Sequence, residues 1–171
     1  MSLDLKTSVT QGAFAVGFIF IGMACGCPLI GWLSDYLGNR VQVMRWCSIV
    51  CLVFMSVIIY HSRFAMNFSY VMMYMIMFCY GIMNSAIVPS YALSTEVVPR
   101  KISGMALGIT NMASVIVGSI FIPLVGFLVD HAQNGMHHYM KLNVTDFQRA
   151  FILLPICFVL CFALTFFIRE T

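Results

Sequence analysis

Gly31-Trp32-Leu33-Ser34-Asp35-Tyr36-Leu37-Gly38-Asn39-Arg40 is a short polar stretch between two apolar runs. Each of the two runs is long enough to cross a bilayer as a helix, which needs about 20 residues. The stretch itself combines small residues with a carboxylate and a guanidinium. Its second glycine tolerates the positive φ of a tight turn. The stretch therefore predicts a tight, charged turn between two membrane helices.

The composition of the chain excludes a soluble domain. Of the 171 residues, 61% are hydrophobic and 9% are charged, and the mean hydropathy is +0.96. A soluble domain carries about 25% charged residues. The net charge of +3 is scattered, without the clustered Lys and Arg of a nucleic-acid-binding surface. We therefore expect an integral membrane protein whose partner is the lipid bilayer, with no nucleic acid.

Five apolar runs are long enough to span a bilayer. Each is apolar on all sides, which is typical of helices in lipid rather than of amphipathic helices on a soluble core. The chain is thus predicted to be an all-α, polytopic membrane protein with a single transmembrane domain over residues 1–171. The predicted spans cover residues 11–32, 43–60, 68–93, 103–129 and 147–168.

Charged residues lie at the ends of these spans. No predicted span carries a carboxylate at its centre, as the high cost of burying a charge in a membrane predicts. A titratable carboxylate for proton coupling would therefore have to come from elsewhere. Basic residues concentrate in the short loops on the side of the 31–40 stretch, which we take as cytoplasmic: Arg40, Arg45, Arg100, Lys101 and Arg169.

The 31–40 stretch resembles the loop G-x-L-[AS]-D-R-x-G-R-[RK] of the major facilitator superfamily. In that family the loop joins the second and third helices of each six-helix half. Tyr36 and Asn39 replace two positions that are usually basic, as is common in the second-half copy of the loop. The matching residues are Gly31, Leu33, Ser34, Asp35, Gly38 and Arg40.

Two later stretches resemble the same family in the expected order. Residues 94–106 are similar to its E-x-x-P-x-x-x-R-G loop, with Glu96, Pro99 and Gly104 in register and Ser103 in place of arginine. Residues 123–130 are similar to the P-x-x-G-x-[LI]-x-D end of helix eleven. The resemblance implies that the five spans are helices eight to twelve, a partial C-terminal six-helix bundle whose N-terminal half is a missing partner.

The resemblance also implies a function. Members of this family are secondary carriers, so we expect the C-terminal portion of a carrier that moves a small polar metabolite (an amino acid, a sugar or an organic acid) by alternating access in the cytoplasmic (inner or plasma) membrane. The alternative is a truncated, non-transporting remnant or an accessory subunit that only packs against another membrane protein. No nucleophile and base can be assembled within the spans, so we expect no catalytic residues and no enzyme.

Loop charges form the first group of candidate functional residues. Opposite charges at helix ends on one membrane face can pair, and in the family the loop carboxylate is thought to hold the inside of the carrier closed. A set of solvated charges that only fixes topology is the simpler alternative. The group consists of Gly31, Asp35, Gly38, Arg40, Glu96 and Arg100.

Polar residues inside the spans form the second group. Tyr80 and Asn84 share a helix face at membrane depth with Tyr91, and Asn111 lies in the next span. The resemblance makes these spans helices ten and eleven, so Tyr80, Asn84 and Asn111 are candidate substrate-binding residues. The alternative is that they only hydrogen-bond between helices and stabilise the bundle.

Small residues at helical spacing form the third group, because they allow helix backbones to approach closely. They are Gly22 and Gly26 in the first span and Gly104, Gly108 and Gly118 in the fourth. We expect two close-packing seams. The seven cysteines and the loop around His131, His137 and His138 match no compact ligand set, so we expect no metal and no cofactor.

Overall fold

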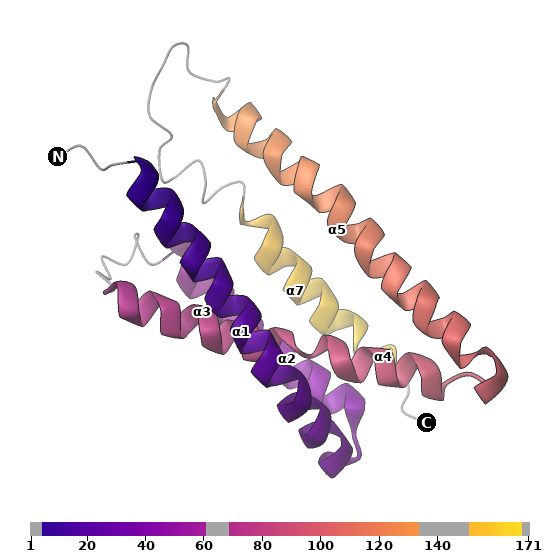
Figure 1. The fold of residues 1–171 in the computed structure, drawn as a ribbon. Coiled ribbons are helices and arrows are strands. Elements are labelled where there is room, and N and C mark those ends of the chain that lie inside the picture. Colours follow the sequence, from indigo (N-terminus) through magenta and orange to yellow (C-terminus); the bar gives the residue numbers. More distant parts are fainter. Residues whose placement is uncertain (1–4, 61–68, 134–150, 169–171) are drawn as a thin grey trace.

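The computed structural model describes residues 5–60, 69–133 and 151–168 as a set of helices (Figure 1). The described part of the chain contains no strand, so the all-α prediction is confirmed. The helices are α1 (Leu5–Leu37), α2 (Arg40–Tyr60), α3 (Tyr70–Asn84), α4 (Ile87–Glu96), the short 3-10 turn η1 (Arg100–Ile102), α5 (Ser103–Gln133) and α7 (Leu153–Leu164).

Four stretches are helical, apolar and long enough to cross a membrane. They are Gln11–Leu37, Arg40–Tyr60, Tyr70–Glu96 and Arg100–Leu128, with mean hydropathies of 1.7 to 2.2. The shorter apolar helix α7 lies within the fifth predicted span, whose start at residue 147 lies outside the described residues. The protein is therefore an integral membrane protein.

The turn in the 31–40 stretch is shorter than its sequence predicts. Helix α1 continues through Leu37, and only Gly38 (φ 61°) and Asn39 separate it from α2. Nothing from Gly31 to Leu37 opposes a helix, whereas glycine in the left-handed region ends one. The Asn39 side-chain oxygen then accepts a hydrogen bond from the Gln42 backbone N–H at 2.7 Å, as an N-cap does. The turn is thus two residues long.

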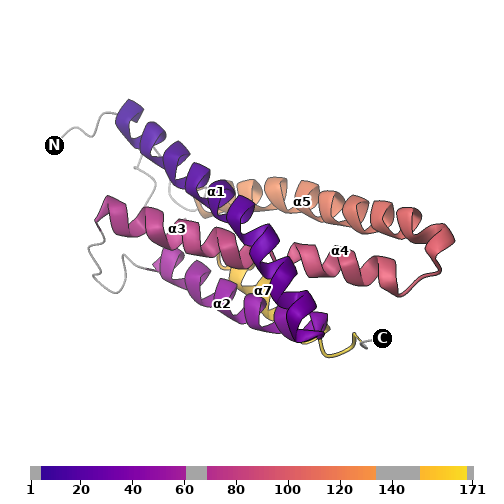
Figure 2. The ribbon, with the colours of Figure 1, turned by 60° about the horizontal axis from the view of Figure 1, so that its bottom comes forward.

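Helices α1 and α3 pack backbone against backbone, and α1 crosses α3 and α2 in Figure 2. Gly22 and Gly26 of α1 lie at this crossing. A Cβ atom on Gly22 would collide with the carbonyl oxygen of Phe78, and one on Gly26 would lie 2.7 Å from the Cα of Ile82. Gly81 of α3 is equally close to the backbone of α1. The two glycines of the first span therefore lie in a close-packing seam.

The third predicted span is not one continuous helix. Helix α3 ends at Asn84 and α4 begins at Ile87. Pro89 has no N–H to donate to the carbonyl of Ser85, which instead accepts from the Val88 N–H at 3.0 Å, one residue earlier than in an α-helix. The α-helical hydrogen bonding is therefore interrupted at Ser85 and Ala86, and α3 and α4 have different main neighbours, α1 for α3 and α5 for α4.

The small core lies beside this break. Ile30, Val43 and Cys47 form a buried cluster, and Met83 and Ala86 pack against it from either side of the break. Helix α7 lies against α2, whereas α5 has its main contacts with α4 and η1 at one end (Figures 1 and 2). The described part of the chain thus forms a compact group of α1–α4 and α7, with α5 largely exposed beside it.

Candidate functional site

Three charged side chains from three helix ends meet at one end of the bundle. The Arg40 guanidinium, at the start of α2, donates from Nε to Glu96 Oε2 at 2.7 Å and from Nη2 to Glu96 Oε1 at 2.6 Å. Its Nη1 lies 3.1 Å from Asp35 Oδ1, near the end of α1. Two parallel bonds from one guanidinium to one carboxylate are the strongest geometry for such a pair. We call Asp35, Arg40 and Glu96 the loop charge network.

The loop charge network is partly in water. The Arg40 side chain is 23% exposed, while those of Glu96 and Asp35 are 45% and 67% exposed. Solvent screening limits each such pair to about 1 kcal/mol or less. The main effect of the loop charge network is therefore geometric, because the rigid guanidinium fixes the ends of α1 and α4 to the start of α2.

The other predicted loop residues have different surroundings. Gly38 forms the α1–α2 turn, and a Cβ on Gly31 would lie 3.5 Å from Val88 Cγ1. Arg100, the first residue of η1, is exposed, and its guanidinium has no hydrogen bond or ion pair to the residues that the structure describes. The structure thus brings together Asp35, Arg40 and Glu96, and places Arg100 apart from them.

A second arginine contact was not predicted. Arg45, on α2, donates from Nε to the Thr165 hydroxyl at 3.2 Å and from Nη2 to the Thr165 carbonyl at 2.9 Å, and it lies 4.5 Å from the ring centre of Phe166. These residues follow the end of α7, so a cation stabilises free carbonyls at a helix C-terminus. The sequence offered one signal for this contact: Arg45 lies on the same predicted membrane face as the end of the last span.

Ser34, in the last turns of α1, is completely buried, and its hydroxyl has no hydrogen-bond partner among the described residues. A buried hydroxyl without a partner costs about 1–3 kcal/mol. We therefore expect Ser34→Ala to raise the unfolding free energy by about 1 kcal/mol, measured by SDS titration of the detergent-solubilised protein. Ser48→Ala is the control, because its hydroxyl donates to the Met44 carbonyl at 2.7 Å. A loss of stability in Ser34→Ala would contradict this account.

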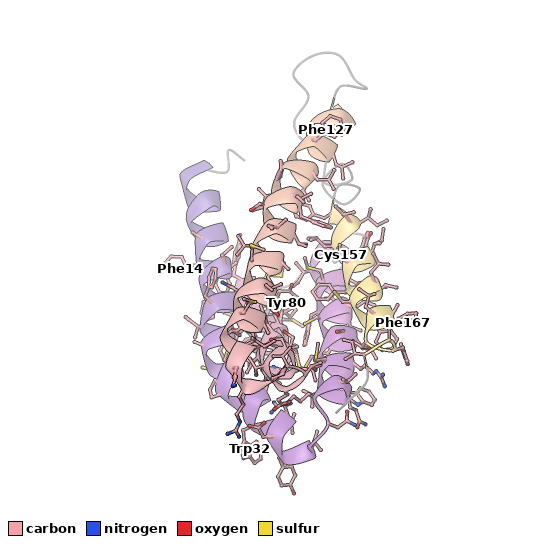
Figure 3. The ribbon with its side chains drawn as sticks, turned by 90° about the vertical axis from the view of Figure 1, so that its right-hand side faces the viewer. Phe14, Trp32, Tyr80, Phe127, Cys157 and Phe167 are labelled. Carbon is pink, nitrogen blue, oxygen red and sulfur yellow. The ribbon has the colours of Figure 1, made fainter. Side chains whose placement is uncertain are left out.

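Two of the membrane-depth candidates point into the compact group of helices. The Tyr80 ring meets the Phe158 ring of α7 edge to face, with centroids 6.4 Å apart, and lies between α1 and α7 in the view of Figure 3. Asn84 donates to the sulfur of Met23 in α1 at 3.8 Å, a weak bond. Both side chains therefore lie among α1, α3 and α7.

Asn84 also lines a cavity of about 330 Å³ between α2, the α3–α4 break and α7. This volume is at the lower limit of small-molecule sites. The walls are mainly apolar and rich in sulfur. Sulfur atoms come from Met44, Cys47, Cys51, Met83 and Cys161.

Asn111 lies elsewhere, on the exposed helix α5. Its side-chain oxygen accepts a hydrogen bond from the Tyr91 hydroxyl of α4 at 3.1 Å. Tyr91 lies on α4, beyond the α3–α4 break and beside α5, and so does not share the surroundings of Tyr80 and Asn84. The three candidate substrate-binding residues are therefore divided between two places, with Tyr80 and Asn84 inside the bundle and Asn111 on its open side.

The glycines of α5 differ from those of α1. A Cβ on Gly104, Gly108 or Gly118 would meet nothing within 4 Å in the described part of the chain. None of the residues of this apolar span is buried. The predicted seam on α5 therefore stays a prediction, and it requires a partner that the described residues do not supply.

One of the comparisons with known proteins finds a family model that matches the chain. A family model described as Major Facilitator Superfamily matches residues 1–171. No curated protein and no solved structure matches. The match covers the whole sequence, including the turn at Gly38 and the stretch around Glu96 that Arg40 ties together. The chain belongs to the major facilitator superfamily, a family of membrane transporters.

Proposed function

We propose that this chain is the C-terminal portion of a secondary carrier that moves a small polar metabolite by alternating access. The observation that carries the proposal is the family match along residues 1–171. In this proposal the five spans act as helices eight to twelve, and a first half that faces α5 completes the central pathway. Two bundles that rock about a site between them would expose it to each side of the membrane in turn.

The loop charge network suits this mechanism, because a rocking bundle must move as one body. Arg40 joins the ends of α1 and α4 to the start of α2. Asp35 keeps much of its surface exposed, so it is free to meet a second half at the cytoplasmic side. We propose that Asp35, Arg40 and Glu96 keep the helices of this bundle together and contribute to closing its cytoplasmic end.

A transport assay on the protein from its own membrane tests the proposed function. The encoded protein is tagged at its C-terminus, purified with any chain that accompanies it and reconstituted in liposomes. Uptake is measured for a panel of radiolabelled amino acids, sugars and organic acids. We expect saturable uptake of at least one solute, and none by a protein produced from residues 1–171 alone. A purified natural protein that moves no solute would favour the alternative of a non-transporting remnant or accessory subunit.

Asn84 stays a candidate substrate contact. Its amide lies at membrane depth and lines the cavity beside the α3–α4 break. Asn84→Ala is expected to lower uptake about fivefold, because a lost hydrogen bond costs about 1 kcal/mol, while the amount of protein in the membrane stays unchanged. The control is Ser90→Ala, since the Ser90 hydroxyl, in the same cavity, donates to the Ile87 carbonyl of its own helix at 2.6 Å. Unchanged uptake by Asn84→Ala would rule this contact out.

A further inference from the structure

The hydrogen bond between Tyr91 and Asn111 joins two helices on the open side of the bundle. The Tyr91 hydroxyl donates to Asn111 Oδ1 at 3.1 Å across the α4–α5 pair. Asn111 is exposed, and the span that contains it has no buried residue. An amide and a phenol are thus presented outward from apolar helices.

The depth of this pair makes contact with lipid unfavourable. Asn111 lies eight residues beyond Ser103, about 12 Å along α5 at 1.5 Å per residue. This position is within the apolar span Arg100–Leu128. Polar side chains inside a membrane face a bundle interior or a water-filled cavity. At this depth the Tyr91–Asn111 pair is therefore unlike the apolar side chains that surround it on α5.

The face of α5 around Asn111 mixes glycines with exposed aliphatic side chains one turn away, Leu107 and Val115. Gly108 and Gly118 lie within about 60° of Asn111 around the helix, at 100° per residue, and a Cβ atom on either would meet nothing within 4 Å in the described ranges. Ile109, by contrast, lies about 160° away and is 56% exposed. A molecule can thus approach the amide over the two glycines, and Ile109 marks the opposite face.

The hydrogen-bond inventory of the pair shows what it can bind. An asparagine amide has two N–H donors on Nδ2, and neither has a partner among the residues that the structure describes. The phenolic oxygen of Tyr91 donates its proton to Asn111 and keeps lone pairs that can accept. The pair therefore presents donors and an acceptor side by side, which a single hydroxyl group satisfies by accepting from one and donating to the other.

The neighbouring sequence contains no charge that would select an ion. Residues 70–95 and 104–128, which include both partners, hold no Asp, Glu, Lys or Arg. Recognition by this part of the chain must therefore depend on uncharged hydrogen bonds.

We propose that Tyr91 and Asn111 face the aqueous pathway and together bind an uncharged hydroxyl group of the transported solute. This inference rests on the proposed function, because it assigns part of the substrate site of the carrier. It differs from the candidate pair Tyr80 and Asn84, whose side chains lie among α1, α3 and α7. The solute that it favours is a hydroxylated one, such as a sugar or polyol.

Cysteine labelling tests whether the pair faces water. The tryptic peptide of residues 102–141 contains none of the native cysteines, so a cysteine introduced there is read by mass spectrometry without altering the others. Asn111→Cys and the matched control Ile109→Cys are exposed, in proteoliposomes, to a charged methanethiosulfonate that does not cross lipid. We expect labelling at position 111 to be at least tenfold faster than at position 109. Equal rates at the two positions would overturn the proposal.

Transport kinetics test the substrate contact. For the solute that the unmodified protein takes up, Tyr91→Phe is expected to raise KM about fivefold, which corresponds to the loss of one hydrogen bond to the solute. The maximal rate should change little. Tyr74→Phe is the control, since its ring would still stack on Phe18. An unchanged KM in Tyr91→Phe, with uptake intact, would refute the contact alone. No uptake of any solute by the unmodified protein would refute the proposed function as well.

Discussion

Gly22→Ala is expected to destabilise the bundle by about 3 kcal/mol, at the upper end of the usual cost of overpacking. The added Cβ would collide with the carbonyl oxygen of Phe78 and crowd the Cα of Gly81. Backbone atoms of a facing helix cannot rotate away as a flexible side chain can. Helices α1 and α3 would have to separate along their whole crossing, which is the most extensive contact between helices in the described residues.

The unfolding free energy in an SDS titration, followed by circular dichroism, measures this effect. Gly17→Ala is the matched control, because a Cβ at Gly17, on the same helix, would meet nothing within 4 Å in the described part of the chain. In a helix interior this exchange gains up to about 1 kcal/mol. The two substitutions should thus move stability in opposite directions. Equal effects would show that the α1–α3 seam is not as close as described.

Arg40→Gln is expected to reduce uptake about tenfold, within the range of couplings between two-state elements. The substitution removes the bidentate bond to Glu96 and the contact with Asp35, so three helix ends lose their common partner. The cost in unfolding free energy should stay below about 1 kcal/mol, because the charges are partly exposed. Arg40→Gln should therefore lower the uptake rate strongly and the unfolding free energy only slightly.

Uptake rates and unfolding free energies on the same proteoliposome and detergent samples separate these two effects. Arg40→Lys should be intermediate, because an ammonium cannot form both parallel bonds to Glu96. Arg100→Gln is the control, since the Arg100 side chain has no polar contact with the described residues. A loss of uptake in Arg100→Gln as large as that in Arg40→Gln would mean that net charge, rather than the loop charge network, matters.

The membrane class and the helical fold could be predicted from the sequence, because apolar length and composition decide both. Three motifs in the family order identified the superfamily, which the family match confirms. The loop motifs also named Asp35, Arg40 and Glu96, which the structure joins although Arg40 and Glu96 are 56 residues apart. Whether they act as a gate stays a prediction.

Other features depend on local geometry that a sequence pattern does not specify. The turn at Gly38 is short because a helix continues until a residue stops it, and polar residues such as Asp35 do not. The periodicity that placed Tyr80 and Tyr91 on one face assumed an unbroken helix, whereas the break at Ser85 separates them. The contact of Arg45 with Thr165 required knowledge of which helix ends lie side by side.

The two glycine stripes illustrate the same limit. Gly22 and Gly26 have the same spacing as Gly104 and Gly108, yet only the first pair meets another backbone within the described residues. Spacing predicts that a helix can be approached closely, and tertiary arrangement decides whether it is. The open stripe on α5 faces the side where our account expects the first half of the carrier, across the aqueous pathway.

Solute counterflow tests the central claim most directly. Proteoliposomes that contain the natural protein are loaded with unlabelled substrate and diluted into a trace of the labelled substrate. In a carrier that works by alternating access, the binding site carries unlabelled solute outward and returns with labelled solute. The labelled solute should therefore accumulate transiently inside the liposomes above its external concentration. Uptake that only equilibrates, or no accumulation above protein-free liposomes, would contradict the account.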